Sequence, residues 1–208
     1  MKNLRLPIAA ITDEFSPTDL EQACAQMESI GMTGAELRVV WGKNIMDLSD
    51  EELDKAKEIC AKHGLKIISI ASPILKCVLP GDHTVDPRFQ QDTFNSKHTF
   101  DDQPKLAARA FEIAKRLGAG IIRVFSYWRT VEPEKTHAAV AEALLKLAEQ
   151  AKEHGLIIGL ENEHACNIGT AAESKVMLAM VQHPNLKLVW DPANAMVGGE
   201  AAAFRFLD

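Results

Sequence analysis

The feature that most constrains the fold is an alternation of short apolar segments, rich in β-branched residues, with longer segments whose apolar residues recur at helical spacing. The short segments, which have the composition of buried strands, are Leu6–Thr12, Gly34–Val39, Lys66–Ser72, Gly120–Ser126, Leu156–Glu161 and Leu186–Asp191. The helical segments between them are Asp19–Ile30, Ser49–His63, Gln103–Leu117, Glu134–His154 and Thr170–Gln182. This alternation predicts stacked βα units around a parallel sheet.

Glycine marks the end of most of the predicted helices. The sequences ESIGM, AKHGL, KRLGA and KEHGL each place a glycine after the last apolar turn, shortly before the next strand. Glycine tolerates the left-handed conformation that commonly follows a helix, and we expect His63 and His154, just before two of these glycines, to interact with the helix dipole. One helix start is marked as well, because Ser49 precedes Glu52 by three residues, as in a capping box.

The number of units points to an incomplete barrel. The strands begin about every 30 residues, except that the third unit carries roughly 25 additional polar residues between Lys76 and Asp102, a length typical of a binding loop or lid. Six units are fewer than the eight that close a TIM barrel, which needs on the order of 250 residues. An open, doubly wound sheet is the alternative, but polar residues at nearly every strand end favour a barrel mouth with a site. We expect one domain over residues 1–208, a TIM-type barrel with about six of its eight units, without a helix after the sixth strand.

Composition and charge argue against several classes of protein. The chain has 208 residues, 47% of them hydrophobic and 25% charged, as is usual for a globular domain. Its formal net charge of -6, without a run of basic residues, argues against a nucleic-acid partner. The apolar stretch 6–11 is too short for a signal peptide or a membrane span, so we expect a cytosolic protein without a membrane partner. The four cysteines are distant from each other and are expected to be buried thiols: Cys24, Cys60, Cys77 and Cys166.

Two neighbouring strands end in carboxylates. The fifth strand runs directly into Glu161, Asn162, Glu163 and His164, and the sixth strand delivers Asp191, followed by a proline turn and Asn194. A carboxylate at such a place is costly to desolvate unless it is paired, hydrogen-bonded or bound to a metal. In a barrel, Glu161 and Asp191 would face the same mouth, within reach of one hard cation such as Mg²⁺ or Mn²⁺.

The motifs LENEH at the fifth strand and WDPAN at the sixth, with GAELR at the second and IIRVFSYW at the fourth, resemble those of the xylose isomerase-like TIM barrels. This group includes sugar-phosphate isomerases, ketose 3-epimerases and inositol-catabolism enzymes, and the similarity extends over essentially the whole chain. In the family, one divalent metal is held by a Glu of strand five, an Asp of strand six, a His of strand seven and a Glu of strand eight. Glu161 and Asp191 match the first two positions, and the other two have no counterpart because the sequence stops before strand seven.

The resemblance implies a metal-dependent isomerase or epimerase that acts on a small sugar, sugar phosphate or polyol. Glu161 would be a metal ligand and the base that removes the proton next to a carbonyl, and Asp191 a second ligand of Mn²⁺, Mg²⁺, Co²⁺ or Zn²⁺. Glu36, His164 and Asn194 would contact the substrate. In the ketose epimerases a strand-eight glutamate shares the proton exchange, so with Glu161 alone one base of the pair is missing.

Several of these residues also have a plain structural interpretation. Glu36 would equally suit an ion pair with Arg38 or Arg123, and the buried guanidinium of Arg123 requires a carboxylate partner in any case. Trp128 suits either core packing or an apolar wall beside a sugar ring. His164 is either a ligand or proton donor, or a hydrogen-bonded loop histidine.

Other functions fit the same pattern. Dehydration of a hydroxy acid uses the same proton abstraction on the same scaffold. A chain without strands seven and eight would alternatively be a catalytically silent binding module or fragment, whose open strand edges favour a homo-oligomer. In a third arrangement, two chains, or this chain and a separate polypeptide, complete one barrel. The abasic-site endonucleases of the superfold need many strand-end histidines and a basic groove, whereas this sequence has mostly carboxylates at its strand ends.

Overall fold

A computed structural model describes residues 7–89 and 97–200 of the chain. They form two compact units, which are described separately. Among these residues, the N-terminal unit comprises residues 7–72 and 109–122, and the C-terminal unit comprises residues 73–89, 97–108 and 123–200. Part of the predicted insertion, residues 90–96, and the end of the chain, residues 201–208, lie outside the described residues.

The main strands follow each other in the sheet in the same order as in the sequence, β1-β2-β5-β6-β7-β8. They are β1 (Ala9–Ile11), β2 (Gly34–Leu37), β5 (Lys66–Ala71), β6 (Ile121–Val124), β7 (Ile157–Glu161) and β8 (Leu186–Val189). A doubly wound sheet reverses its strand order at a switch point, whereas a barrel adds each new strand on the same side. The observed order is therefore that of six consecutive barrel units.

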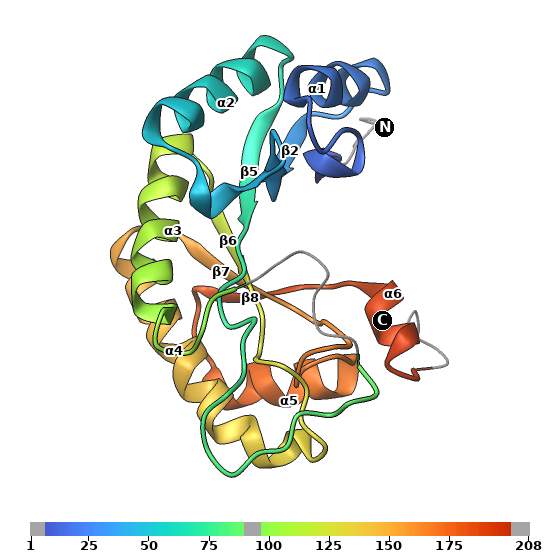
Figure 1. Cartoon of the computed structure of the whole chain (residues 1–208), viewed down its shortest axis with the longest axis vertical. Helices are drawn as coiled ribbons and strands as arrows, with labels where there is room; N and C mark the ends of the chain where they lie inside the picture. Colours follow the sequence, from blue (N-terminus) through green and yellow to red (C-terminus); the bar gives the residue numbers. More distant parts are fainter. Residues whose placement is uncertain (1–6, 90–96, 201–208) are drawn as a thin grey trace, which may run out of the picture. The chain divides into compact units, whose positions relative to one another are not determined.

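In the N-terminal unit, β1, β2 and β5 pair in parallel. Helices α1 (Leu20–Ser29) and α2 (Asp50–Lys62) pack on each other, and α2 contacts β5 (Figure 1). Gly34 is needed for a close approach of the first two strands, because a Cβ atom at this position would lie 2.8 Å from the Cβ of Ala9. A small hairpin of β3 (Val39–Val40) and β4 (Lys43–Asn44), which was not predicted, follows β2.

In the C-terminal unit, β7 and β8 pair in parallel, with Glu161 opposite Val189. Helix α4 (His137–Glu153) contacts β7, and α5 (Ala171–Val181) contacts β8 and α4 (Figure 1). A short helix, α6 (Pro192–Val197), begins directly after the sixth strand, so the expectation that no helix follows this strand was wrong. The proline was interpreted as a turn, but it stands in the first turn of a helix, where its missing N–H costs nothing.

The predicted helices form close to their expected bounds. Helix α3 spans Gln103–Leu117, as predicted, and only Glu134–His154 differs noticeably, because the 3₁₀ turn η3 (Pro133–Thr136) precedes α4. The capping box of Ser49 and Glu52 is present. Glycines with positive φ follow four helices, namely Gly31, Gly64, Gly118 and Gly155, and all four cysteines are buried and free. None of the described helices is both long and apolar enough to cross a membrane.

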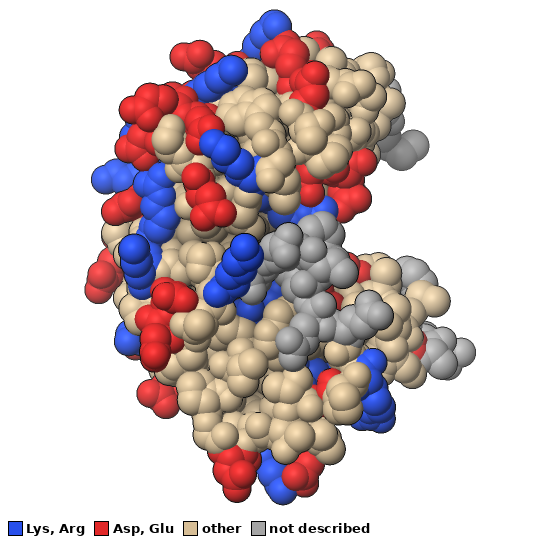
Figure 2. All heavy atoms as spheres, in the orientation of Figure 1, with Lys and Arg blue, Asp and Glu red and all other residues tan. Residues whose placement is uncertain are grey.

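Acidic and basic side chains are intermixed on the outer face of α2 and the second half of α3 (Figure 2). Arg116 of α3 lies 2.8 Å from Asp50 and 2.6 Å from Asp54 of α2. These partners are exposed, and water and salt screen such surface ion pairs. The charges on this face therefore stabilise the packing of the helices only modestly.

His63 at the end of α2 should make the stability of the N-terminal unit depend on pH. Its Nδ1 lies 2.7 Å from Glu28 and its Nε2 2.9 Å from Glu21, and these two carboxylates of α1 raise the pKa of His63. A histidine with a raised pKa stabilises the fold fully below its unfolded pKa, and this contribution disappears as the pH rises through the folded pKa. We expect the free energy of unfolding to fall by less than about 1 kcal/mol over this range.

Urea denaturation between about pH 6 and pH 9 measures this effect, since the unfolded pKa of histidine is about 6.5. His63→Gln should remove this part of the pH dependence, and so should the double variant Glu21→Gln/Glu28→Gln. An unchanged slope in both variants would show that His63 does not contribute to it.

Candidate functional site

A buried ion pair lies where β6 and β7 end. Arg123 belongs to β6 and Glu161 is the last residue of β7, and Arg123 Nη1 lies 3.0 Å from Glu161 Oε2. Their side chains are only 8% and 11% exposed. The carboxylate partner that the sequence required for Arg123 is therefore Glu161. The guanidinium offsets part of the cost of burying the Glu161 carboxylate at the strand end.

A second ion pair lies beside the first. Lys76 Nζ lies 3.5 Å from Glu163 Oε2, and both side chains are mostly buried. The lysine also lies over the ring of Phe125, 4.3 Å from its centroid, and the guanidinium of Arg123 lies 5.0 Å from the same centroid. The aromatic ring thus interacts with two cations, and each of these is paired with a carboxylate from the end of β7.

Asn162 fixes the backbone of Asp191 at the end of the neighbouring strand. Its Oδ1 accepts from the N–H of Asp191 at 2.7 Å, and its Nδ2 donates to the carbonyl oxygen of the same residue at 2.7 Å. This side chain imitates a peptide group and continues the pairing of β7 with β8 beyond Glu161. The carboxylate of Asp191 in turn accepts from the N–H of Asn194 at 2.9 Å and caps α6.

His164 and Asn194, both predicted to contact a substrate, lie side by side. His164 Nδ1 is 2.8 Å from Asn194 Oδ1 and 2.9 Å from Glu163 Oε1. The imidazole is partly exposed, with 31% of its side-chain surface accessible. The loop after β7 and the first turn of α6 therefore meet at this histidine.

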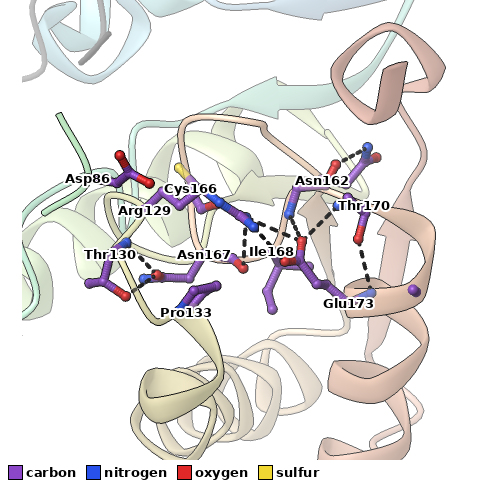
Figure 3. A network of polar contacts seen from close by, with 12 residues as sticks. Asp86, Arg129, Thr130, Pro133, Asn162, Cys166, Asn167, Ile168, Thr170 and Glu173 are labelled. Carbon is purple, nitrogen blue, oxygen red and sulfur yellow. Dashed lines mark hydrogen bonds and ion pairs between the residues drawn. The ribbon is translucent and has the colours of Figure 1, made fainter. Parts of the chain in front are cut away.

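A polar network holds the loop that carries these residues (Figure 3). Arg129 Nη2 donates to Glu173 Oε1 at 2.7 Å, and Arg129 Nη1 donates to the carbonyl oxygen of Cys166 at 3.1 Å. Burial alone would raise the pKa of Glu173, but the hydrogen bonds from Arg129 and from the N–H of Gly169 bring it below its usual value. The loop is thus tied to α5 by an ionised carboxylate.

Trp128 belongs to the apolar side of the same loop. It is 6% exposed and packs in one cluster with Phe125, Ala165 and Cys166. Its burial favours the packing interpretation over an apolar wall beside a sugar ring.

Glu36, the fifth predicted site residue, lies at the end of β2 in the N-terminal unit and accepts a hydrogen bond from Ser69 Oγ at 2.5 Å. Its predicted contact with a substrate stays a prediction. Arg38, one of its expected partners, forms ion pairs with Asp13 and Glu14.

The donor chemistry of Glu161 and Asp191 suits a hard cation, since both offer carboxylate oxygens from adjacent strands. The set is incomplete, however. Within residues 7–89 and 97–200, no group of three or more His, Cys, Asp and Glu side chains is arranged to hold a metal ion. Glu161 is paired with Arg123, and Asp191 accepts a hydrogen bond in α6. These two residues by themselves therefore do not form a complete metal site.

Lys76, Asn162 and Glu163 were not assigned a role from the sequence. The sequence signal for the last two was their position directly after Glu161, next to a strand end. For Lys76 the only signal was its place a few residues after the end of β5, because its partner Glu163 is 87 residues away in the chain.

Comparison with known proteins identifies the family. Residues 24–208 match the xylose isomerase-like TIM barrels. No curated protein matches this sequence significantly. Among solved structures, D-psicose 3-epimerase from Clostridium cellulolyticum H10, determined with D-tagatose, superposes with a TM-score of 0.67 at 15% sequence identity and covers 94% of this chain and 66% of its own.

Two further structures are similar. The probable 3-DHS dehydratase AsbF of Bacillus anthracis, involved in petrobactin synthesis, has a TM-score of 0.65 at 17% identity and covers 93% of this chain and 66% of its own. A xylose isomerase-like TIM barrel protein from Mycobacterium smegmatis, determined in complex with magnesium, has a TM-score of 0.59 at 19% identity and covers 88% of this chain and 63% of its own.

At such low identities these likenesses show the fold, and the chain spans about two thirds of the length of the three structures. Together with the strand order, they confirm the predicted TIM-type fold with six units. Because the family match extends over most of the sequence, the chain belongs to the xylose isomerase-like TIM barrel family.

Proposed function

We propose that this chain is part of an isomerase or epimerase that acts on a small sugar, sugar phosphate or polyol by removing the proton next to a carbonyl group. The observation that carries the proposal is the buried, ion-paired carboxylate of Glu161 at a strand end. A base that is already desolvated and held in one orientation needs little reorganisation to take a proton from carbon. Sugar epimerases among the similar structures support the substrate class.

In this proposal, Glu161 is the base and Arg123 orients its carboxylate. Glu161 and Asp191 are two of the ligands of a divalent cation, Mn²⁺, Mg²⁺, Co²⁺ or Zn²⁺. When bound, the cation supplies a Lewis acid that polarises the carbonyl oxygen of the substrate. Glu36, His164 and Asn194 contact hydroxyl groups of the substrate. We also predict that the protein is cytosolic.

A dehydratase that acts on a hydroxy acid is the second candidate. One of the similar structures is a probable 3-DHS dehydratase, and its reaction class also begins with removal of a proton next to a carbonyl. A protein that dehydrates a hydroxy acid and turns over no sugar would favour this candidate.

The first test is metal-dependent stability. Added Mn²⁺ should stabilise the wild-type protein by about 2.7 kcal/mol at a free metal concentration about 100 times the dissociation constant, and thermal melting measures this stabilisation. The double variant Glu161→Gln/Asp191→Asn should lose this stabilisation. A matched control, Asp101→Asn/Glu153→Gln, removes two exposed carboxylates of the same unit and should keep it.

Turnover of ketoses and polyols completes the test. Glu161→Gln should lower kcat about 10²- to 10⁴-fold, the usual effect of losing a general base. A protein that gains no stability from Mn²⁺ and turns over no sugar would support the silent binding module. A monodisperse homo-oligomer with measurable Mn²⁺ affinity would support a barrel completed by more than one chain.

A further inference from the structure

Two acceptor atoms hold the same nitrogen of His164. Glu163 Oε1 lies 2.9 Å and Asn194 Oδ1 lies 2.8 Å from Nδ1. A carboxylate oxygen and an amide oxygen both accept hydrogen bonds, so two acceptors at one nitrogen place the hydrogen on Nδ1. A neutral imidazole has one N–H, and its other nitrogen, Nε2, then has a free lone pair.

Glu163 has a cationic partner and a backbone donor. Lys76 Nζ lies 3.5 Å from Oε2, and the N–H of Ala165 donates to Oε1 at 3.3 Å. The backbone of Glu163 is also fixed, because its N–H donates to the carbonyl oxygen of Ile168 and its own carbonyl oxygen accepts from the N–H of Cys166. The carboxylate that selects the tautomer therefore has a fixed place and a cationic partner.

Asn194 is equally constrained. Its N–H donates to the carboxylate of Asp191 in the first turn of α6, and the peptide of Asp191 is held by Asn162. If the Asn194 amide were turned over, its NH₂ group would face the Nδ1–H that Glu163 requires. The assigned orientation, with Oδ1 toward His164, is the one that both hydrogen bonds allow.

The side chain of His164 is 31% exposed. Among the described residues, hydrogen bonds are formed at its Nδ1 and none is formed at its Nε2. Phe89 lies on one side, with 6.3 Å between the centroids of its ring and the imidazole.

We propose that Glu163 and Asn194 are positioning residues that fix the Nδ1–H tautomer of His164, and that Nε2 is a second acid–base group of the site. Isomerisation of a hydroxy-carbonyl compound moves a proton between two oxygens as well as between two carbons. Nε2 takes the proton from the hydroxyl, so that an O–H bond breaks and an N–H bond forms, and later returns it to the former carbonyl oxygen. Between these two proton transfers, the carboxylate of Glu163 stabilises the imidazolium of His164. The acid–base role rests on the proposed function, whereas the tautomer does not.

The tautomer is measured by long-range ¹H–¹⁵N correlation spectra of the protein labelled at its seven histidines, at a pH where His164 is neutral. Loss of one set of signals in His164→Gln assigns the residue. The wild type should show hydrogen on Nδ1, and Glu163→Ala/Asn194→Ala should shift it toward Nε2, whereas the control Glu153→Ala should not. Hydrogen on Nε2 in the wild type, or an unchanged tautomer in the double variant, would overturn the proposal.

Activity separates the two proposals. His164→Gln should lower kcat about 10²-fold or more in isomerisation, and Glu163→Gln should lower kcat more than it changes KM, because the amide still orients the ring but does not stabilise its charge. Turnover lost in Glu161→Gln but kept in His164→Gln overturns the acid–base role and leaves the proposed function in place. Turnover kept in Glu161→Gln overturns the proposed function, and the tautomer is then still decided by the spectra.

Discussion

Replacing Asn167 with alanine should lower the free energy of unfolding by about 3 kcal/mol, the cost of leaving several buried peptide groups without a partner. The side chain is fully buried. Its Nδ2 donates to the carbonyl oxygens of Ser126 and Trp128 at 3.0 and 3.1 Å. Its Oδ1 accepts from Thr130 N–H at 2.9 Å and from Thr130 Oγ1 at 3.1 Å (Figure 3). Urea denaturation measures the loss.

Two further variants show whether the hydrogen bonds are responsible. Asn167→Asp keeps the shape, but its carboxylate cannot donate to the two carbonyl oxygens, so it should be at least as unstable as Asn167→Ala at neutral pH. Asn185→Ala removes a partly exposed asparagine that donates one side-chain hydrogen bond, to the carbonyl oxygen of Leu156 at 2.7 Å, and should cost about 1 kcal/mol. If Asn167→Ala cost no more than Asn185→Ala, the network would not be a determinant of stability.

Asn167 also bears on the site. It joins the loop after β6 to the loop after β7, and the second loop carries Glu163 and His164. If the proposed function is right, a variant that folds but constrains this loop less should have a lower kcat, because groups that transfer protons must be held at hydrogen-bond distance from the substrate.

Local patterns were sufficient to predict the order of strands and helices. Each βα unit repeats its own periodicity, and most of the helices end at a glycine, so that no knowledge of distant contacts is needed. The positions of Glu161 and Asp191 were also predictable from local patterns. The carboxyl ends of neighbouring parallel strands lie side by side, and this arrangement does not depend on the conformation of the loops.

The parts that the sequence did not predict depend on tertiary contacts or on ambiguous local signals. The pairing of Lys76 with Glu163 joins residues 87 positions apart, and Asn167 becomes a hydrogen-bond hub only because two loops converge on it. The β3–β4 hairpin turns at Trp41 and Gly42, both with positive φ, and tryptophan gives no turn signal. The start of α6 was visible as Asp191 followed by a proline, but a proline after a strand also suits a turn.

Replacing Arg123 with methionine should destabilise the protein by about 3 kcal/mol or more, because Glu161 would lose the guanidinium that accompanies it in a buried place. Methionine has a similar length but no charge, so the variant loses both the ion pair with Glu161 and the cation–π contact with Phe125. Arg116→Met is the matched control, since its partners Asp50 and Asp54 are exposed, and it should destabilise the protein much less than Arg123→Met. Urea denaturation of both variants tests the difference.

A double-mutant cycle shows whether Arg123 and Glu161 act as a unit. Arg123→Met/Glu161→Gln should be more stable than Arg123→Met alone, since the neutral amide is cheaper to bury than the unpaired carboxylate. Additive effects would mean that the ion pair does not couple the two residues. The proposed metal site adds a further consequence. A cation bound to Glu161 would replace the missing guanidinium, so Mn²⁺ should stabilise Arg123→Met more than the wild type, and an equal effect on both would place the cation away from this carboxylate.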